Sequence, residues 1–149
     1  MIVDFWQAAE RDGRLEKLRR CGEKPPAILG LGSWDPECPI KGQRYTICIE
    51  ETEETDFSGV GNEFDLYSKD IGRTEWLCFE MHEEVFQQRF WRDNPYRMMG
   101  EIGFAFNTEE DGSGDTGLHF DVYPPDYDRE RNPRMQFWIT VVRKDAVHT

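Results

Sequence analysis

Hydrophobic side chains recur with a helical period over residues 3–20 and alternate with polar ones in several shorter segments. The apolar face of the first stretch carries Val3, Trp6, Ala9, Leu15 and Leu18. Gly13 lies in its middle and favours a break or bend, because glycine weakens a helix interior. Pro25 and Pro26 cannot continue a helix, so we expect the helical region to end before them.

Short apolar or alternating segments predict strands, because successive side chains of a strand point to opposite faces. These segments are residues 27–34, 44–51, 75–81, 118–123 and 135–142, with a shorter apolar patch at 64–67 as a possible further strand. The first two are separated by a proline-containing turn segment and are expected to pair as a hairpin. Residues 82–94 show no clear period.

A second helix is expected to begin at Asn94 and Pro95, which are typical of an N-cap and a first helical turn. Apolar residues continue at a helical spacing, which predicts a helix to about Asn107. Residues 108–117 contain no apolar side chain and are expected to form a loop.

The order of these elements predicts an α+β fold with a largely antiparallel sheet. A helix followed by two strands occurs twice, at residues 3–51 and 95–142, which indicates an internal repeat of element order. The length of 149 residues fits a single domain, residues 1–149.

The charge of the chain argues against nucleic acid as a partner. It carries 30 acidic and 18 basic side chains, a formal net charge of −12. Nucleic acids attract clustered Lys and Arg, and this chain presents the opposite field. No stretch approaches the roughly 18 apolar residues of a membrane span, and no signal peptide is visible, so no membrane partner is expected.

The cysteines and other reactive residues match no standard metal or cofactor motif. There is no C-x-x-C pair among Cys21, Cys38, Cys48 and Cys78, and we expect free thiols in a reducing cytoplasm. Gly30-x-Gly32 is followed by Ser-Trp-Asp-Pro and by no helix, so it does not fit a dinucleotide site. We therefore expect neither a metal nor a cofactor.

Several segments together carry a family likeness: EWLCFEM, PYRMMGEIGFAF, GLHFDVYPP and MQFWITVV in the second half, and SWDP and RYTICIEE in the first. The chain resembles the GyrI-like small-molecule-binding domain, the effector-binding module of many AraC-type and MerR-type multidrug regulators, which also occurs alone. The resemblance implies a pseudo-twofold pair of β-α-β-β units that form one sheet, two helices on one face, and a groove between them.

The most specific part of the likeness is the segment from His119 to Tyr123. It implies that Asp121 stands where the family commonly has a glutamate that faces cationic ligands. The chain departs from the family in three ways. It begins almost at the helix, without the usual first strand; Asp121 is one methylene shorter than Glu; and Gly103–Phe106 replace the Trp-Leu-Pro that commonly ends the second helix.

Strand alternation places His119, Asp121 and Tyr123 on one face and Phe120 and Val122 on the other. The Phe120 face is expected to pack on the core, which leaves the Asp121 face in solvent or lining a groove. A carboxylate among aromatic rings loses hydration and needs a charge partner, which an organic cation supplies. The candidate walls, each of which is otherwise an ordinary core residue, are Trp34, Tyr45, Trp76, Phe104, Phe106 and Trp138.

The sequence therefore favours stand-alone binding of small apolar or cationic molecules, as a sensor or sequestering module, by a monomer or homodimer. One alternative is a hydrolase of electrophilic small molecules, in which Asp121 acts as general base and Tyr123 positions or protonates. A further alternative is a protein–protein interaction module.

Overall fold

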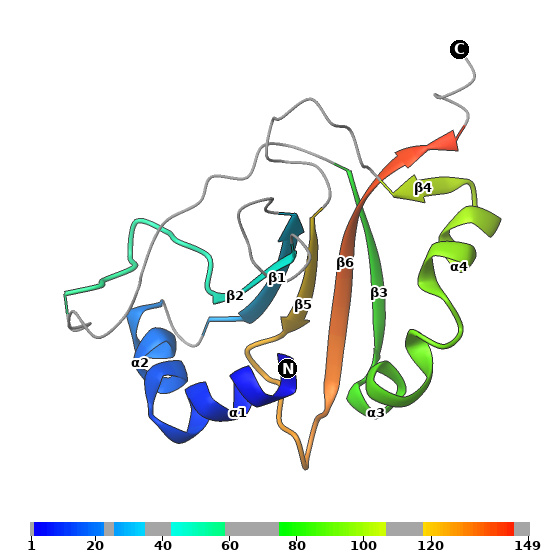
Figure 1. The fold of residues 1–149 in the computed structure, drawn as a ribbon. Helices are drawn as coiled ribbons and strands as arrows, with labels where there is room; N and C mark the ends of the chain where they lie inside the picture. Colours follow the sequence, from blue (N-terminus) through cyan, green and yellow to red (C-terminus); the bar gives the residue numbers. More distant parts are fainter. Residues whose placement is uncertain (1, 23–25, 35–42, 59–74, 107–117, 145–149) are drawn as a thin grey trace.

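The computed structural model describes residues 2–22, 26–34, 43–58, 75–106 and 118–144, without the side chains of residues 2, 33, 34, 43 and 44. Figure 1 shows these residues as a curved sheet flanked by helical segments. The elements are α1 (Ile2–Arg11), α2 (Arg14–Cys21), β1 (Ile28–Trp34), β2 (Gln43–Cys48), β3 (Trp76–His82), α3 (Glu83–Val85), η1 (Phe86–Phe90), α4 (Pro95–Glu101), β4 (Phe104–Phe106), β5 (His119–Tyr123) and β6 (Arg134–Arg143).

The strands form a six-stranded antiparallel sheet, so the predicted α+β class is confirmed. The strand order is β2-β1-β5-β6-β3, and β4 pairs with the end of β6. The expected hairpin of β1 and β2 is present, with Leu29 opposite Cys48 and Gly32 opposite Tyr45. The pseudo-twofold relation between the two halves stays a prediction. The patch at 64–67 and the loop at 108–117 lie outside the described residues.

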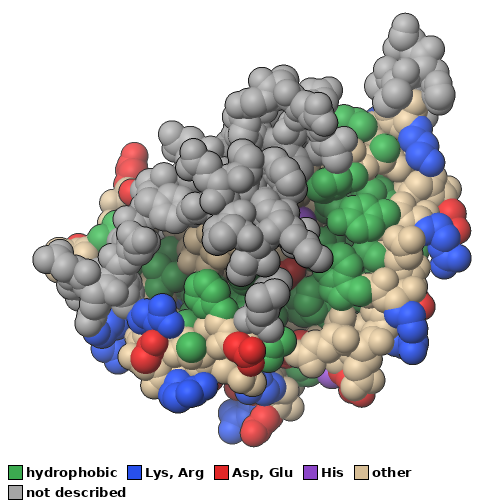
Figure 2. Space-filling view, in the orientation of Figure 1, with side chains coloured by type: hydrophobic (Ala, Val, Ile, Leu, Met, Phe, Trp, Pro, Cys, Tyr) green, Lys and Arg blue, Asp and Glu red, His purple; other side chains and the backbone are tan. Residues whose placement is uncertain are grey.

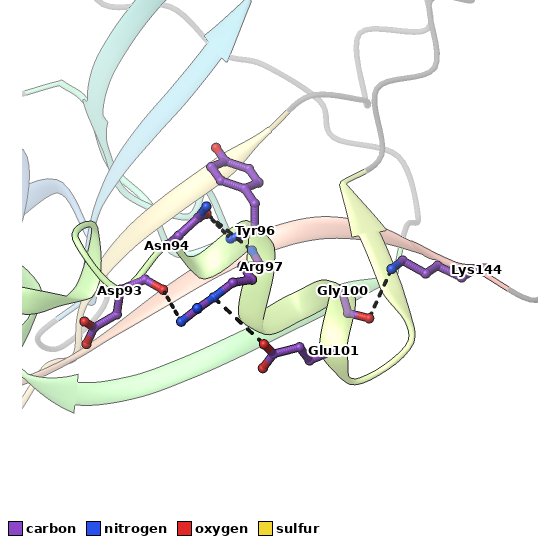
Figure 3. A network of polar contacts seen from close by, with 7 residues as sticks. All are labelled: Asp93, Asn94, Tyr96, Arg97, Gly100, Glu101 and Lys144. Atoms are coloured by element: carbon purple, nitrogen blue, oxygen red, sulfur yellow. Dashed lines mark hydrogen bonds and ion pairs between the residues drawn. The ribbon is translucent and has the colours of Figure 1, made fainter.

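The first helical region divides where glycine interrupts it. Gly13 adopts φ 85°, a left-handed conformation that favours glycine, and separates α1 from α2. The second helix begins as predicted, because the Asn94 side chain accepts hydrogen bonds from the backbone N–H groups of Tyr96 and Arg97 at 3.1 and 3.3 Å. Figure 3 shows this cap, and at the other end of α4 the Lys144 ammonium donates to the Gly100 carbonyl.

The prediction that the second helix extends to residue 107 is wrong. The helix ends at Glu101, and Gly103 adopts φ 94°, which reverses the chain. The next three residues form β4, in which Phe104 pairs with Arg143 and Phe106 with Val141. The apolar spacing that resembled a helix instead serves a strand, because tertiary pairing overrides a short periodic pattern.

Helical segments from both halves of the chain cover the same face of the sheet, the one that carries Asp121. Asp121 is paired with Phe137 of β6 and so shares its face. The ring of Trp6 in α1 lies 5.3 Å from that of Tyr123, and the ring of Phe90 in η1 lies 5.3 Å from that of Phe137. This arrangement agrees with the expectation of helices on one face.

Each side of the sheet has its own hydrophobic cluster. The helix-covered side is filled by Phe90, Met99, Phe137, Ile139 and Val141. The opposite side is filled by Leu31, Leu118, Phe120 and Val122. Both faces of β5 are therefore buried. The Phe120 face packs on a core as expected, and of the two placements left open for the Asp121 face, solvent or a groove, exposure to solvent is excluded.

Candidate ligand-binding site

Asp121 is a buried carboxylate near the middle of the sheet. Strand β5 lies between β1 and β6, and Asp121 is only 7% exposed. Its Oδ2 accepts a hydrogen bond from the Tyr45 hydroxyl across 2.7 Å. The same hydroxyl accepts a hydrogen bond from Trp6 Nε1 across 2.9 Å. A chain of three side chains thus joins helix α1, strand β2 and strand β5.

A glycine makes the contact between Tyr45 and Asp121 possible. Tyr45 belongs to β2, and strand β1 separates β2 from β5. Gly30 of β1 is paired with Asp121, and a Cβ at Gly30 would overlap the Tyr45 hydroxyl. Because glycine has no Cβ, the phenol ring can cross β1 and reach the carboxylate.

Burial sets the charge state of this site. It raises the pKa of Asp121 to about 6, and the hydrogen bond from Tyr45 partly opposes that rise. Burial, followed by the nearby charge of Asp121, raises the pKa of both Tyr45 and Tyr123 above the usual value. At neutral pH the site therefore holds one carboxylate and two neutral phenols. Among the described residues no Lys or Arg forms an ion pair with Asp121.

Aromatic rings stand edge to face around this carboxylate. The Trp6 ring lies 6.4 Å from the Tyr45 ring and meets the Tyr123 ring at an interplanar angle of 70°. Tyr123 lies 4.9 Å from Tyr127, whose hydroxyl donates to Glu83. The Asp121 side chain is thus held in a largely aromatic setting, where a cation gains attraction from both the carboxylate and the ring faces.

His119 provides an imidazole on the same strand face. A Cβ at Gly32 would overlap its ring, which lies 5.5 Å from the ring of Phe137. Its Nδ1 is buried and has no hydrogen-bond partner within the described chain. Burial lowers the pKa of His119, which favours the neutral form of its ring.

The structure brings four of the predicted site residues together: Asp121, Tyr123, His119 and Tyr45. Phe104 and Phe106, on β4, pack instead against the hydrophobic cluster of the helix-covered side. The backbone of Trp34 ends β1, and its side chain lies outside the described part. In Figure 2 hydrophobic side chains gather near the centre of the view, with charged side chains along the lower and right-hand rim.

The structure corrects the expectation that Trp76 and Trp138 stand beside Asp121. The Trp76 ring lies 5.4 Å from that of Phe120, which points to the opposite face of the sheet from Asp121. Trp138 is paired with Phe120 across β5 and β6 and shares that opposite face. Alternation within each strand was visible in the sequence, but the register between the strands was not.

Sequence reasoning also missed Trp6 and the role of the glycines. Trp6 appeared only as an apolar position of the first helix, 39 residues before the tyrosine that it contacts. Gly30 and Gly32, which do not fit a dinucleotide site, instead make room for the rings of Tyr45 and His119. A Gly-x-Gly pair inside an apolar strand indicates that other groups approach the strand backbone closely, and this signal is present in the sequence.

No protein-family model, curated protein or solved structure matches this chain. Among the described residues no helix is long and apolar enough to cross a membrane, and no three His, Cys, Asp or Glu side chains gather as metal ligands. Cys21, Cys48 and Cys78 carry free thiols.

Proposed function

We propose that this chain is a GyrI-like domain that binds small organic cations at Asp121, as a sensor or sequestering module. The observation that carries the proposal is a carboxylate 7% exposed, hydrogen-bonded to one phenol and lacking a cationic partner in the described chain. An unpaired charge in a poorly hydrated site is costly, so an incoming cation would gain by pairing with it. The free thiols support the expected reducing, cytoplasmic setting.

The strand order supports the family assignment. Strands β1 and β5 lie next to each other, and each has the strand that follows it in the chain, β2 or β6, on its other side. A pseudo-twofold pair of units would give this order. Helical segments of both halves on one sheet face fit the same arrangement.

A ligand that binds at Asp121 would either displace the Trp6 ring or bind beside it. Trp6 contacts Tyr45 and Tyr123 from helix α1 and donates to the hydroxyl that bonds Asp121. Helix α1 leaves Val3 61% and Phe5 39% exposed, whereas Ala9 is buried. A ligand cation that stacks on Tyr45 and Tyr123 would compete with the Trp6 ring, which contacts both.

Calorimetric titration with benzyltrimethylammonium and its uncharged isostere neopentylbenzene tests the proposal. We expect the wild-type protein to bind the cation more tightly than the isostere. Asp121→Asn should weaken the cation about tenfold or more and leave the isostere unchanged, because only the cation uses the charge. Asp93→Asn, which removes the same charge from an exposed residue before α4, is the matched control. Equal affinity of Asp121→Asn and wild type for the cation would refute binding at this site.

A hydrolase remains a second candidate because the pKa of Asp121, about 6, suits a general base near neutral pH. The phenol that contacts the carboxylate is Tyr45, so this residue takes the place first expected for Tyr123. Mass spectrometry of electrophilic epoxide probes after incubation separates the two functions. Turnover that Asp121→Asn abolishes would establish hydrolysis, and probes that stay intact would exclude it for that compound class.

A further inference from the structure

The sheet face opposite to Asp121 carries a hollow of about 560 Å³. Its walls include the side chains of Trp76, Phe120 and Trp138 from three adjacent strands. Pro124 adds a rigid apolar edge directly after β5. The volume lies in the range of about 300–1,000 Å³ that is usual for sites of small molecules.

The three aromatic rings form one continuous wall. The Trp76 ring lies 5.4 Å from the Phe120 ring and 6.2 Å from the Trp138 ring, tilted by 42° and 56°. The Trp138 indole N–H donates to the Gln136 side chain across 2.9 Å, which fixes the ring orientation. Trp138 is 36% exposed, so a large aromatic surface is open to a ligand.

The charges around the hollow favour a positive ligand. Glu50 lines it, and no Lys or Arg is found among the described lining residues. The chain as a whole carries a net charge of −12, which adds to the attraction of cations. Indole rings bind cations through their faces more strongly than other aromatic side chains do.

We propose that this hollow is a second binding site, which takes planar aromatic molecules and prefers those with a positive charge. It does not depend on the proposed function of Asp121, because the two sites lie on opposite faces of the sheet. A tricyclic ring can stack on one of the two indole faces and contact the edge of the other, while its charge faces Glu50. A folded protein domain is too large for a hollow of this volume, so a small molecule is the fitting occupant.

The test uses 9-aminoacridine, a planar cation, and acridine, which has the same ring system and is neutral at pH 7.5. Dye fluorescence titrations should show saturable binding of both, with the cation tighter. Trp138→Leu should weaken both about tenfold, because it removes half of the tryptophan wall. Glu50→Gln should weaken 9-aminoacridine alone, about twofold to fivefold, as expected for one exposed charge.

A control variant separates the loss of this site from the unspecific loss of a tryptophan. Trp91 is 44% exposed and contacts Phe137 on the helix-covered side, so Trp91→Leu should leave both affinities unchanged. Neutral acridine reports on this hollow apart from Asp121, because the site at Asp121 is proposed to select cations. Unchanged acridine binding in a folded Trp138→Leu variant would overturn the proposal. If Trp138→Leu does not fold, Ala27→Trp takes its place in the test. Ala27 lines the hollow, so the larger side chain should fill it and prevent acridine from binding.

Discussion

The Tyr45 hydroxyl reaches Asp121 Oδ2 across 2.7 Å although strand β1 lies between the strands that carry them. This contact crosses Gly30, the residue of β1 that is paired with Asp121. It defines the candidate site, because it orients the buried carboxylate and connects it through Trp6 to helix α1.

Gly30→Ala should destabilise the protein by about 1–3 kcal/mol, because the new Cβ would overlap the Tyr45 hydroxyl and force its ring to move. Urea unfolding measures the change. Gly100→Ala is the matched control, because the atom nearest to its Cβ would be the flexible Lys144 Nζ at 3.1 Å. Alanine in a helix interior is better than glycine by about 0.5–1 kcal/mol, so this control should be neutral or stabilising. An equal effect of both substitutions would contradict the close approach at Gly30.

The burial of Asp121 should make stability depend on pH. Its pKa rises from 3.8 to about 6 in the folded protein, so between these values the folded state binds more protons than the unfolded state. The free energy of unfolding therefore falls as the pH rises from about 4 to about 6, and it stays lowered above that range. The change amounts to about 2–3 kcal/mol at 1.36 kcal/mol per pKa unit.

Asp121→Asn removes the titration of this carboxyl group. The difference in stability between wild type and variant therefore reports on Asp121 apart from the other titrating groups. Unfolding of wild type and variant at pH 4 and pH 7.5 should show the variant gaining stability relative to the wild type at the higher pH. The same wild-type-to-variant difference at both pH values would mean that Asp121 titrates normally.

Tyr45→Phe should raise the pKa of Asp121 beyond about 6, because the hydrogen bond from Tyr45 lowers it in the wild type. A ¹³C NMR titration of the Asp121 carboxyl carbon measures the change directly. Tyr96→Phe, at a residue 44% exposed on α4, removes a hydroxyl elsewhere and should leave this pKa as it is. An unshifted Asp121 titration in Tyr45→Phe would show that the hydrogen bond does not form in solution.

Local features of the sequence determined most elements of the fold. The break at Gly13, the helix start at Asn94 and the alternation that puts His119, Asp121 and Tyr123 on one face depend on neighbouring residues alone. The helix end was wrong by several residues, because pairing of Phe104–Phe106 with β6 is a long-range interaction that no local pattern shows.

Only the tertiary structure decided which aromatic residues share a face with Asp121. Strand order and register placed Tyr45 beside it and turned Trp76 and Trp138 to the other side, and packing of α1 brought in Trp6. The physical reason is that alternation fixes the relative directions of side chains within one strand. The neighbours of a strand depend instead on packing between segments that are far apart in the chain.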